Sequence, residues 1–284
     1  MTKREHKNLK AGLYLVATPI GNLRDISLRA LEVLEFADVI LCEDTRVSGK
    51  LLSAHDIRGK KLIPYNDHSN EGQRDKIIRM LEDGQVVALI SDAGMPLISD
   101  PGYKLVQSCA EKNIYISSIP GANAPLMALQ LSGLPSDKFS FIGFLPHKTA
   151  ARQKLLQDWV GVPGTLIAFE SASRLQSALV DIGAVMGVRE VAVARELTKL
   201  YEEVRRGSAN ELVAYYKEHG PPKGEIVLII APPAAKEWTE VEIQGLLKDA
   251  LKTMKTKDAA KAVADQTGGQ PKKLYDLALT LTKV

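Results

Sequence analysis

The stretch that decides the fold reads Ser91-Asp92-Ala93-Gly94-Met95-Pro96-Leu97-Ile98-Ser99-Asp100-Pro101-Gly102. It follows the apolar run at 86–90 and precedes a helical pattern, so it connects a buried strand to a helix. Such loops lie at the carboxyl edge of a parallel sheet, where open α/β folds bind ligands. The loop is longer than a simple connection needs, and Gly94 lets a ligand approach the backbone, which together predict a binding loop. Asp100 and Pro101 are also typical of a helix N-cap and first helical residue.

A second loop of the same kind lies near the N-terminus. Residues 13–17 predict a strand, 18–22 interrupt it, and a helix is expected to start at 25–27. Residues 37–42 return as a strand that ends in Glu43-Asp44-Thr45-Arg46. Neither loop carries the G-x-G-x-x-G dinucleotide fingerprint or a phosphate-binding P-loop. This argues against nucleotide hydrolysis and ordinary nicotinamide chemistry.

The order of elements predicts an α/β protein with several parts. Strand-like runs alternate with helical patterns as far as 139–144, as in a parallel α/β domain. Four further strands follow, and the one at 201–206 comes too soon after its predecessor for a crossover, so the second sheet should be mixed. Amphipathic helices occupy the rest of the chain. We therefore expect a basic tail at 1–11, an N-terminal α/β domain at 12–146, a second α/β domain at 147–233 and a helical appendage at 234–284.

The composition is that of a globular protein. Of 284 residues, 45% are hydrophobic and 25% charged, and the formal net charge is +3, far below that of an autonomous nucleic-acid binder. No apolar run has the length of a membrane span and no secretory signal is expected, which favours the cytoplasm. Cys42 and Cys109 have no metal-ligand spacing and are expected to be reduced core residues.

The lysines of the appendage allow two interpretations. They could touch RNA or form a solvated cap, and the sequence does not decide between them. They are Lys255, Lys257, Lys261, Lys272 and Lys273.

Several motifs in fixed order resemble a known family. The run at 18–27, the tetrad at 43–46, the loop at 91–102 and Pro120-Gly121-Ala122-Asn123-Ala124 are similar to the small-subunit (16S) ribosomal RNA 2′-O-ribose methyltransferase I family, in the tetrapyrrole-methylase superfamily of class III S-adenosylmethionine-dependent methyltransferases. The resemblance covers roughly residues 12–232. It implies two α/β domains with a donor-binding cleft between them, S-adenosylmethionine as cofactor, a homodimer, and a cytidine ribose of 16S rRNA as substrate, within the assembled small ribosomal subunit.

The resemblance also implies which residues bind the donor. By motif position these residues are Pro19, Ile20, Ala93, Gly94, Met95, Ile98, Gly121, Ala122, Phe169, Glu170, Gly224 and Glu225. We expect no metal, because the sequence has no His/Cys cluster with ligand spacing and the motif loops lack convergent carboxylates. One departure from the superfamily is visible. Tetrapyrrole methylases carry Gly-Asp-Pro in the second loop, whereas this chain has Gly94-Met95-Pro96, which argues against a tetrapyrrole substrate.

The acceptor side is less defined by the sequence. A ribose 2′-hydroxyl is a weak nucleophile at neutral pH, so a general base or a charge that stabilises the developing oxyanion would help. The candidates are Asp44, Arg46, His68 and Asp100. Asp44 with Arg46 is favoured, because a carboxylate and a guanidinium follow a buried strand where solvation alone does not require them. The base itself stays unassigned.

Arg195 and Glu196, near a predicted turn, are expected to meet the nucleotide backbone, against the alternative of a salt-bridged hairpin. Two other functions remain open for the whole chain. The acceptor could be a small macrocycle, or the protein could be a non-catalytic RNA-binding assembly factor with a vestigial donor pocket.

Overall fold

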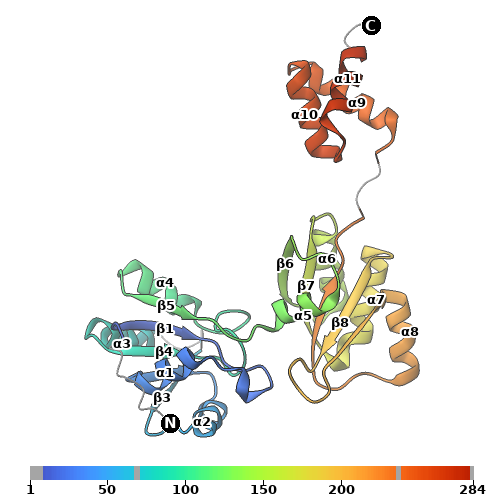
Figure 1. Cartoon of the computed structure of the whole chain (residues 1–284). Coiled ribbons are helices and arrows are strands. Elements are labelled where there is room, and N and C mark those ends of the chain that lie inside the picture. The colour runs from blue at the N-terminus through green and yellow to red at the C-terminus, as the bar shows by residue number, and fades with distance from the viewer. Residues whose placement is uncertain (1–8, 67–70, 235–237, 282–284) are drawn as a thin grey trace. The chain divides into compact units, whose positions relative to one another are not determined.

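The computed structural model describes residues 9–66, 71–234 and 238–281. By its internal contacts the chain divides into two compact units, residues 1–233 and 234–284. The first unit holds two five-stranded sheets, and the second is a group of three helices (Figure 1).

The first sheet is entirely parallel, as predicted, with strand order β3-β2-β4-β1-β5. Its strands are β1 (Gly12–Val16), β2 (Val39–Cys42), β3 (Lys61–Pro64), β4 (Val86–Leu89) and β5 (Ile116–Ile119). Every residue of β2 and β4 is buried, because apolar clusters cover both faces of the sheet. The accompanying helices are η1 (Leu23–Asp25), α1 (Leu28–Phe36), α2 (Thr45–Ala54), α3 (Glu71–Glu82) and α4 (Tyr103–Glu111). Because β1 and β4 are neighbours, the loops that follow them emerge side by side.

The second sheet is mixed, which confirms the prediction made from the short connection. Its order is β6-β7-β10-β8-β9, and only β6 and β7 run parallel among these pairs. The strands are β6 (Phe139–Phe144), β7 (Thr165–Ser171), β8 (Glu190–Arg195), β9 (Glu203–Ser208) and β10 (Glu225–Ile230). One face packs on a large apolar core with helices α6 (Thr149–Trp159), η2 (Ala172–Arg174), α7 (Leu175–Met186) and α8 (Ala209–His219).

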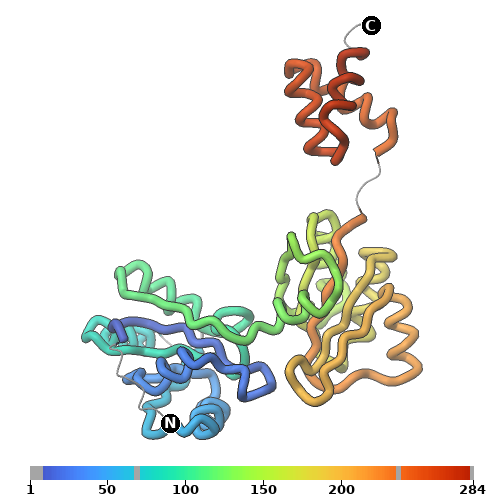
Figure 2. The backbone as a smooth tube through the Cα atoms, viewed as in Figure 1, coloured from blue at the N-terminus to red at the C-terminus, as the bar shows by residue number. Residues whose placement is uncertain are grey.

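Helix α5 (Ala124–Ser132) packs on the other face of the second sheet. Ala128 and Leu129 are buried there against Ile167 and Ala192, and Arg206 Nε donates to the carbonyl of Ser132 at 2.7 Å. The chain thus passes from the first sheet to the second between β5 and α5 (Figure 2). The placement of the strand at 139–144 in the first domain was wrong, because its hydrogen bonds go to β7.

The expected N-cap at Asp100 was also wrong. Helix α4 begins at Tyr103, and its N-cap is Gly102, with φ of +131° and no capping side chain. The φ of Gly102 lies in a region that other residues rarely adopt, and a Cβ there would lie 2.7 Å from Leu89 Cδ2 and 3.0 Å from Leu97 Cδ1, so a larger residue would strain the backbone and displace these side chains. The loop therefore keeps an irregular course through Asp100 instead of starting the helix there.

The C-terminal unit consists of α9 (Glu240–Leu251), α10 (Thr256–Thr267) and α11 (Pro271–Leu281) around its own small apolar core. The five lysines of this appendage that the sequence analysis lists are all exposed. Their exposure fits both contact with RNA and a solvated cap. Cys42 and Cys109 are buried free thiols, as predicted. None of the helices in the described part of the chain has the length and hydrophobicity needed to span a bilayer.

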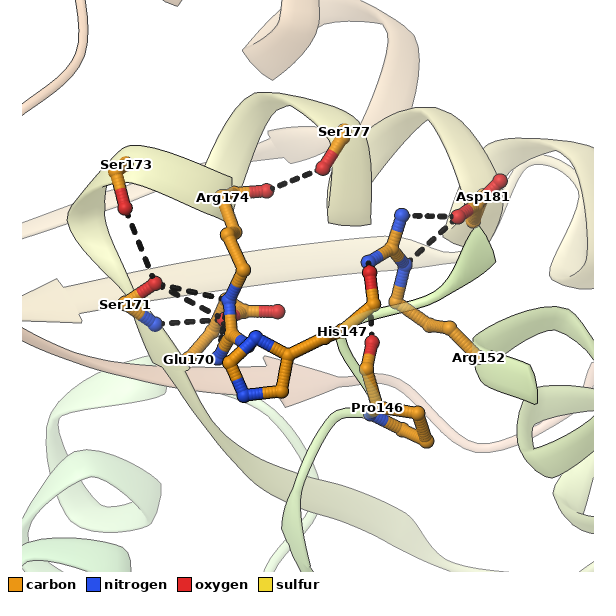
Figure 3. A network of polar contacts seen from close by, with 9 residues as sticks. All are labelled: Pro146, His147, Arg152, Glu170, Ser171, Ser173, Arg174, Ser177 and Asp181. Carbon is orange, nitrogen blue, oxygen red and sulfur yellow. Dashed lines mark hydrogen bonds and ion pairs between the residues drawn. The ribbon is translucent and has the colours of Figure 1, made fainter. Parts of the chain in front are cut away.

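A buried ion pair fixes the segment between β6 and α6. Arg152 Nε donates to Asp181 at 2.7 Å, and both side chains are at most 5% exposed. Arg152 also donates to the carbonyls of Pro146 and His147 (Figure 3). Removing one partner would leave a charge buried without compensation.

We expect Asp181→Ala to lower the free energy of unfolding by about 3–5 kcal/mol, since the Arg152 guanidinium loses its counter-charge. The control is Glu82→Ala, which breaks the half-exposed Lys112–Glu82 pair and should cost about 0–1 kcal/mol. Urea unfolding followed by circular dichroism measures both. Equal losses in the two variants would contradict this role for the buried pair.

Candidate functional site

A cavity of about 410 Å³ opens where the loops after β1 and β4 meet the second sheet. Two backbone hydrogen bonds hold these loops together: Thr18 N donates to Gly94 O at 2.8 Å, and Gly94 N donates to Thr18 O at 3.1 Å. The Thr18 hydroxyl also donates to Ser91 O at 3.1 Å, and both residues are buried. Buried polar groups satisfied in this way give the loops one defined arrangement.

The cavity contains most of the residues that the resemblance assigned to the donor. Nine of those twelve line it: Ile20, Ala93, Gly94, Met95, Ile98, Phe169, Glu170, Gly224 and Glu225. The other three line smaller hollows that share a residue with the cavity. Gly121 and Ala122 lie in one with Asn123, and Pro19 lies in another with Asp92. The motif positions thus converge on one region of the unit.

At two positions of the cavity wall the structure requires a glycine. Gly94 adopts a φ of +81°, a left-handed conformation that other residues rarely take. Gly224 has a φ of +95°, and a Cβ there would overlap the carboxylate of Glu196. Glu196 Oε1 accepts from the backbone N–H of Glu225 at 3.1 Å and from Lys199 Nζ at 2.9 Å. Glu196 therefore supports the start of β10 at the cavity wall.

Arg195 forms an ion pair with Glu203 across the hairpin, at 2.8 Å. Arg195 and Glu196 thus have partners within the protein, which fits the salt-bridged alternative. Their expected contact with nucleotide stays a prediction.

Glu170 offers an unused hydrogen-bond acceptor at the cavity. Its side chain is fully buried, and Oε1 accepts from the Ser171 N–H at 2.7 Å and from Arg174 at 2.6 Å. Arg174 in turn contacts His147 (Figure 3). Glu170 Oε2 is buried without a hydrogen-bond partner among the described residues. An unsatisfied carboxylate oxygen is costly, so this atom is suited to accept from a ligand N–H or O–H group.

Three further carboxylates line the same cavity: Glu43, Asp92 and Asp100. Burial raises the pKa of Glu43, and the nearby carboxylates of Asp100 and Asp92 raise it further. Burial also raises the pKa of Asp100, against the lowering effect of a hydrogen bond with Ser91. Glu43 Oε1 is buried with no hydrogen-bond partner in the described structure. Carboxyl groups with raised pKa are suited to proton transfer near neutral pH.

The sequence analysis missed Glu43 and favoured its neighbour. Asp44 is the N-cap of α2, where Oδ1 accepts from the Arg46 N–H at 2.7 Å, and its carboxylate pairs with the Arg46 guanidinium. Neither residue is among those lining the cavity. The Arg46 side chain lowers the pKa of Asp44 to about 2, so this carboxylate is a weak base. Helix capping explains why a carboxylate follows the buried strand. Asp44 therefore has a structural reason to be there, although solvation alone does not require it.

His68 lies outside the described residues. Among the residues that the structure does describe, no group of three or more His, Cys, Asp or Glu side chains could hold a metal ion.

Comparisons with known proteins agree with this geometry. A family model described as Tetrapyrrole (Corrin/Porphyrin) Methylases matches residues 12–213, and the chain belongs to that family. A second model, described as the RsmI C-terminal HTH domain, matches residues 239–282. A solved structure, uroporphyrin-III C-methyl transferase from Thermus thermophilus complexed with S-adenosyl homocysteine, covers 78% of this chain and 97% of its own, with a TM-score of 0.53 and 18% identity. That likeness supports the fold.

Two curated relatives are much closer in sequence, and both are named ribosomal RNA small subunit methyltransferase I. The protein of Mesorhizobium japonicum (strain LMG 29417 / CECT 9101 / MAFF 303099) is 48% identical over 96% of this chain and 93% of its own length. That of Rickettsia prowazekii (strain Madrid E) is 47% identical over 86% of each chain. The chain therefore belongs to the family of these relatives, which match 86–96% of its length.

Gly94→Val should weaken binding of S-adenosylmethionine at least tenfold, about 1.4 kcal/mol. A β-branched residue at a φ of +81° strains the loop, and the added Cβ would lie 3.4 Å from Ile20 Cγ2. Titration calorimetry measures the dissociation constant.

The matched control is Gly84→Val. Gly84 has a φ of +83° and no atom within 4 Å of an added Cβ, and it does not line the cavity. It should lose stability without losing donor affinity. Unchanged affinity in Gly94→Val, or the same loss in Gly84→Val, would disprove a donor role for this loop.

Proposed function

We propose that this protein transfers a methyl group from S-adenosylmethionine to the ribose 2′-oxygen of a cytidine in small-subunit (16S) ribosomal RNA. The observation that carries the proposal is the cavity, in which nine residues assigned from motifs come together in a chain 47–48% identical to named methyltransferases of this rRNA. We further propose that the substrate is the assembled small subunit, that the enzyme works in the cytoplasm and that it acts as a homodimer.

The cavity residues fit the donor. Gly94 lets the ligand approach the backbone, and Glu170 Oε2 is free to accept a hydrogen bond from one of its N–H or O–H groups. When bound, the donor supplies a methyl group on an electrophilic sulfonium. The protein must hold the acceptor hydroxyl in line with that group, and such positioning contributes much of the rate of this kind of reaction.

We assign proton removal from the 2′-hydroxyl to Glu43, with Asp100 as its partner in the cavity. Both pKa values are raised by burial, so either carboxylate holds a proton more strongly than an exposed one. Asp100 belongs to the set named from sequence, whereas Asp44 and Arg46 are paired with one another and do not line the cavity. His68 stays a prediction.

The function is tested in a bacterial strain that lacks its own small-subunit rRNA methyltransferase I. Expression of this chain should restore a 2′-O-methylcytidine, detected by mass analysis of nucleosides from small-subunit rRNA. Purified protein should also transfer labelled methyl groups from S-adenosylmethionine to subunits of that strain. Binding to subunits without transfer would support the assembly-factor alternative, and neither binding nor transfer would favour a small acceptor.

Glu43→Gln should lower the single-turnover methylation rate on the order of a hundredfold, the contribution of a general base. It should also raise the melting temperature at neutral pH. The folded-state pKa of Glu43 lies above its unfolded value, so ionisation opposes folding once the pH rises through the folded pKa. This gain in stability should vanish below about pH 4.3, where the unfolded carboxyl is also protonated.

Asp44→Ser is the matched control for Glu43→Gln. Serine keeps the helix cap and removes the charge, so the methylation rate should stay close to that of the wild type. Rapid-quench kinetics and thermal melts over a pH series measure these effects. If Asp44→Ser loses the rate and Glu43→Gln keeps it, Asp44 is the base instead.

A further inference from the structure

Phe144 is an aromatic side chain that the fold leaves unburied at the cavity. It is 57% exposed, and it lines the cavity together with Phe169. Burying a phenylalanine side chain stabilises a protein, and this position forgoes much of that gain. It is neither a donor residue implied by the motifs nor one of the carboxylates discussed above.

A β-bulge places the ring on this face of the sheet. Along β6, Phe141 packs on the face of α5, and Ile142 packs on the opposite face, against the core of α6 and α7. Regular alternation would send Phe144 to the same face as Ile142. Instead the register shifts: Phe141 pairs with Ile167 but Phe144 with Phe169, so three steps on β6 match two on β7.

Gly143 supplies this extra residue, with a φ of +71°. Leu145 then returns to the opposite core and is buried. Bulges of this kind re-aim side chains next to active sites.

The ring of Phe144 belongs to a row of three aromatic side chains, with Phe169 and Phe141. The centroid of Phe144 lies 5.1 Å from that of Phe169 in a tilted contact, and Phe169 meets Phe141 edge-on at 4.9 Å. Phe169 thus packs against one side of Phe144, which is otherwise partly exposed and lines the cavity. A flat, apolar and partly exposed ring in this position offers a face for stacking.

The proposed methylation gives a stacking face at the cavity a role. This part of the argument rests on the proposed function. A 2′-hydroxyl can reach a recessed cavity only when its nucleotide leaves the stack of its neighbours, which costs stacking energy. Glu43, Asp92 and Asp100 line the same cavity, so their negative charge disfavours entry of the phosphates. Sugar and base are the parts that can enter, and an unstacked base regains stacking on an aromatic ring.

We propose that Phe144 stacks on the base of the acceptor nucleotide and so presents its ribose to the donor. The Gly143 bulge is then part of the acceptor site, because without it the ring would turn into the core. Stacking tolerates any base, so Phe144 contributes affinity and placement, and discrimination between bases falls to polar groups.

The test uses the full-length enzyme and small subunits from the strain that lacks this methylation. Phe144→Ala and Phe144→Leu should each raise the KM for subunits at least tenfold, whereas Phe144→Trp should stay within threefold of the wild type. Leucine keeps the apolar bulk and loses the aromatic face, so it separates stacking from hydrophobic filling. The dissociation constant for S-adenosylmethionine should change less than twofold in all three.

Phe139→Ala is the matched control, since Phe139 is 46% exposed on the same strand and does not line the cavity. It should leave the KM unchanged, and circular dichroism should show all variants folded. A normal KM in Phe144→Leu, or a defect confined to donor affinity, overturns the inference and would make Phe144 a donor contact. A wild-type enzyme inactive on subunits would instead overturn the proposed function, and this inference with it.

Discussion

The pair of hydrogen bonds between Thr18 and Gly94 is the contact on which the site depends. Parallel pairing of β1 and β4 brings the two loops to the same sheet edge, and these bonds, with the Thr18 hydroxyl on Ser91 O, fix them to one another. Each buried bond contributes about 1 kcal/mol, and a partner left unsatisfied costs more. Ile20 and Gly94 can therefore face one cavity although more than seventy residues separate them.

Much of the fold was predictable because its signals are local. The fully apolar runs of β2 and β4 indicate buried parallel strands, and the brief step from β8 to β9 indicates an antiparallel pair. Sheet membership is not a local property. Residues 139–144 read as a strand in either domain, and only pairing with β7 assigns them to the second sheet. The start of α4 was missed for a similar reason, since the positive φ of Gly102, which ends the loop beside Leu89 and Leu97, is a property of the folded loop.

Motifs were enough to predict that residues assigned to the donor meet at one cavity, and their binding of the donor stays a prediction. The residues proposed for the acceptor side could not be found in this way. Loop motifs carry their backbone conformation with them, so Gly94 and Met95 could be placed from sequence. The raised pKa of Glu43 arises from burial and from the carboxylates of Asp100 and Asp92, which come from another loop, and the exposure of Phe144 arises from a register shift. Both properties arise only in the folded structure, so the local sequence around Glu43 and Phe144 does not reveal them.

The cavity also concentrates features that cost stability. Leu97 and Ser99 adopt left-handed conformations, with φ of +72° and +67°, each at a cost of roughly 1–3 kcal/mol. Glu43 and Glu170 each keep a buried oxygen without a hydrogen-bond partner among the described residues. Such features persist only where the surrounding structure imposes them. A ligand that hydrogen-bonds to Glu170 and a ribose that gives its proton to Glu43 would relieve these costs, so the groups that cost stability are the ones proposed to act in binding and catalysis.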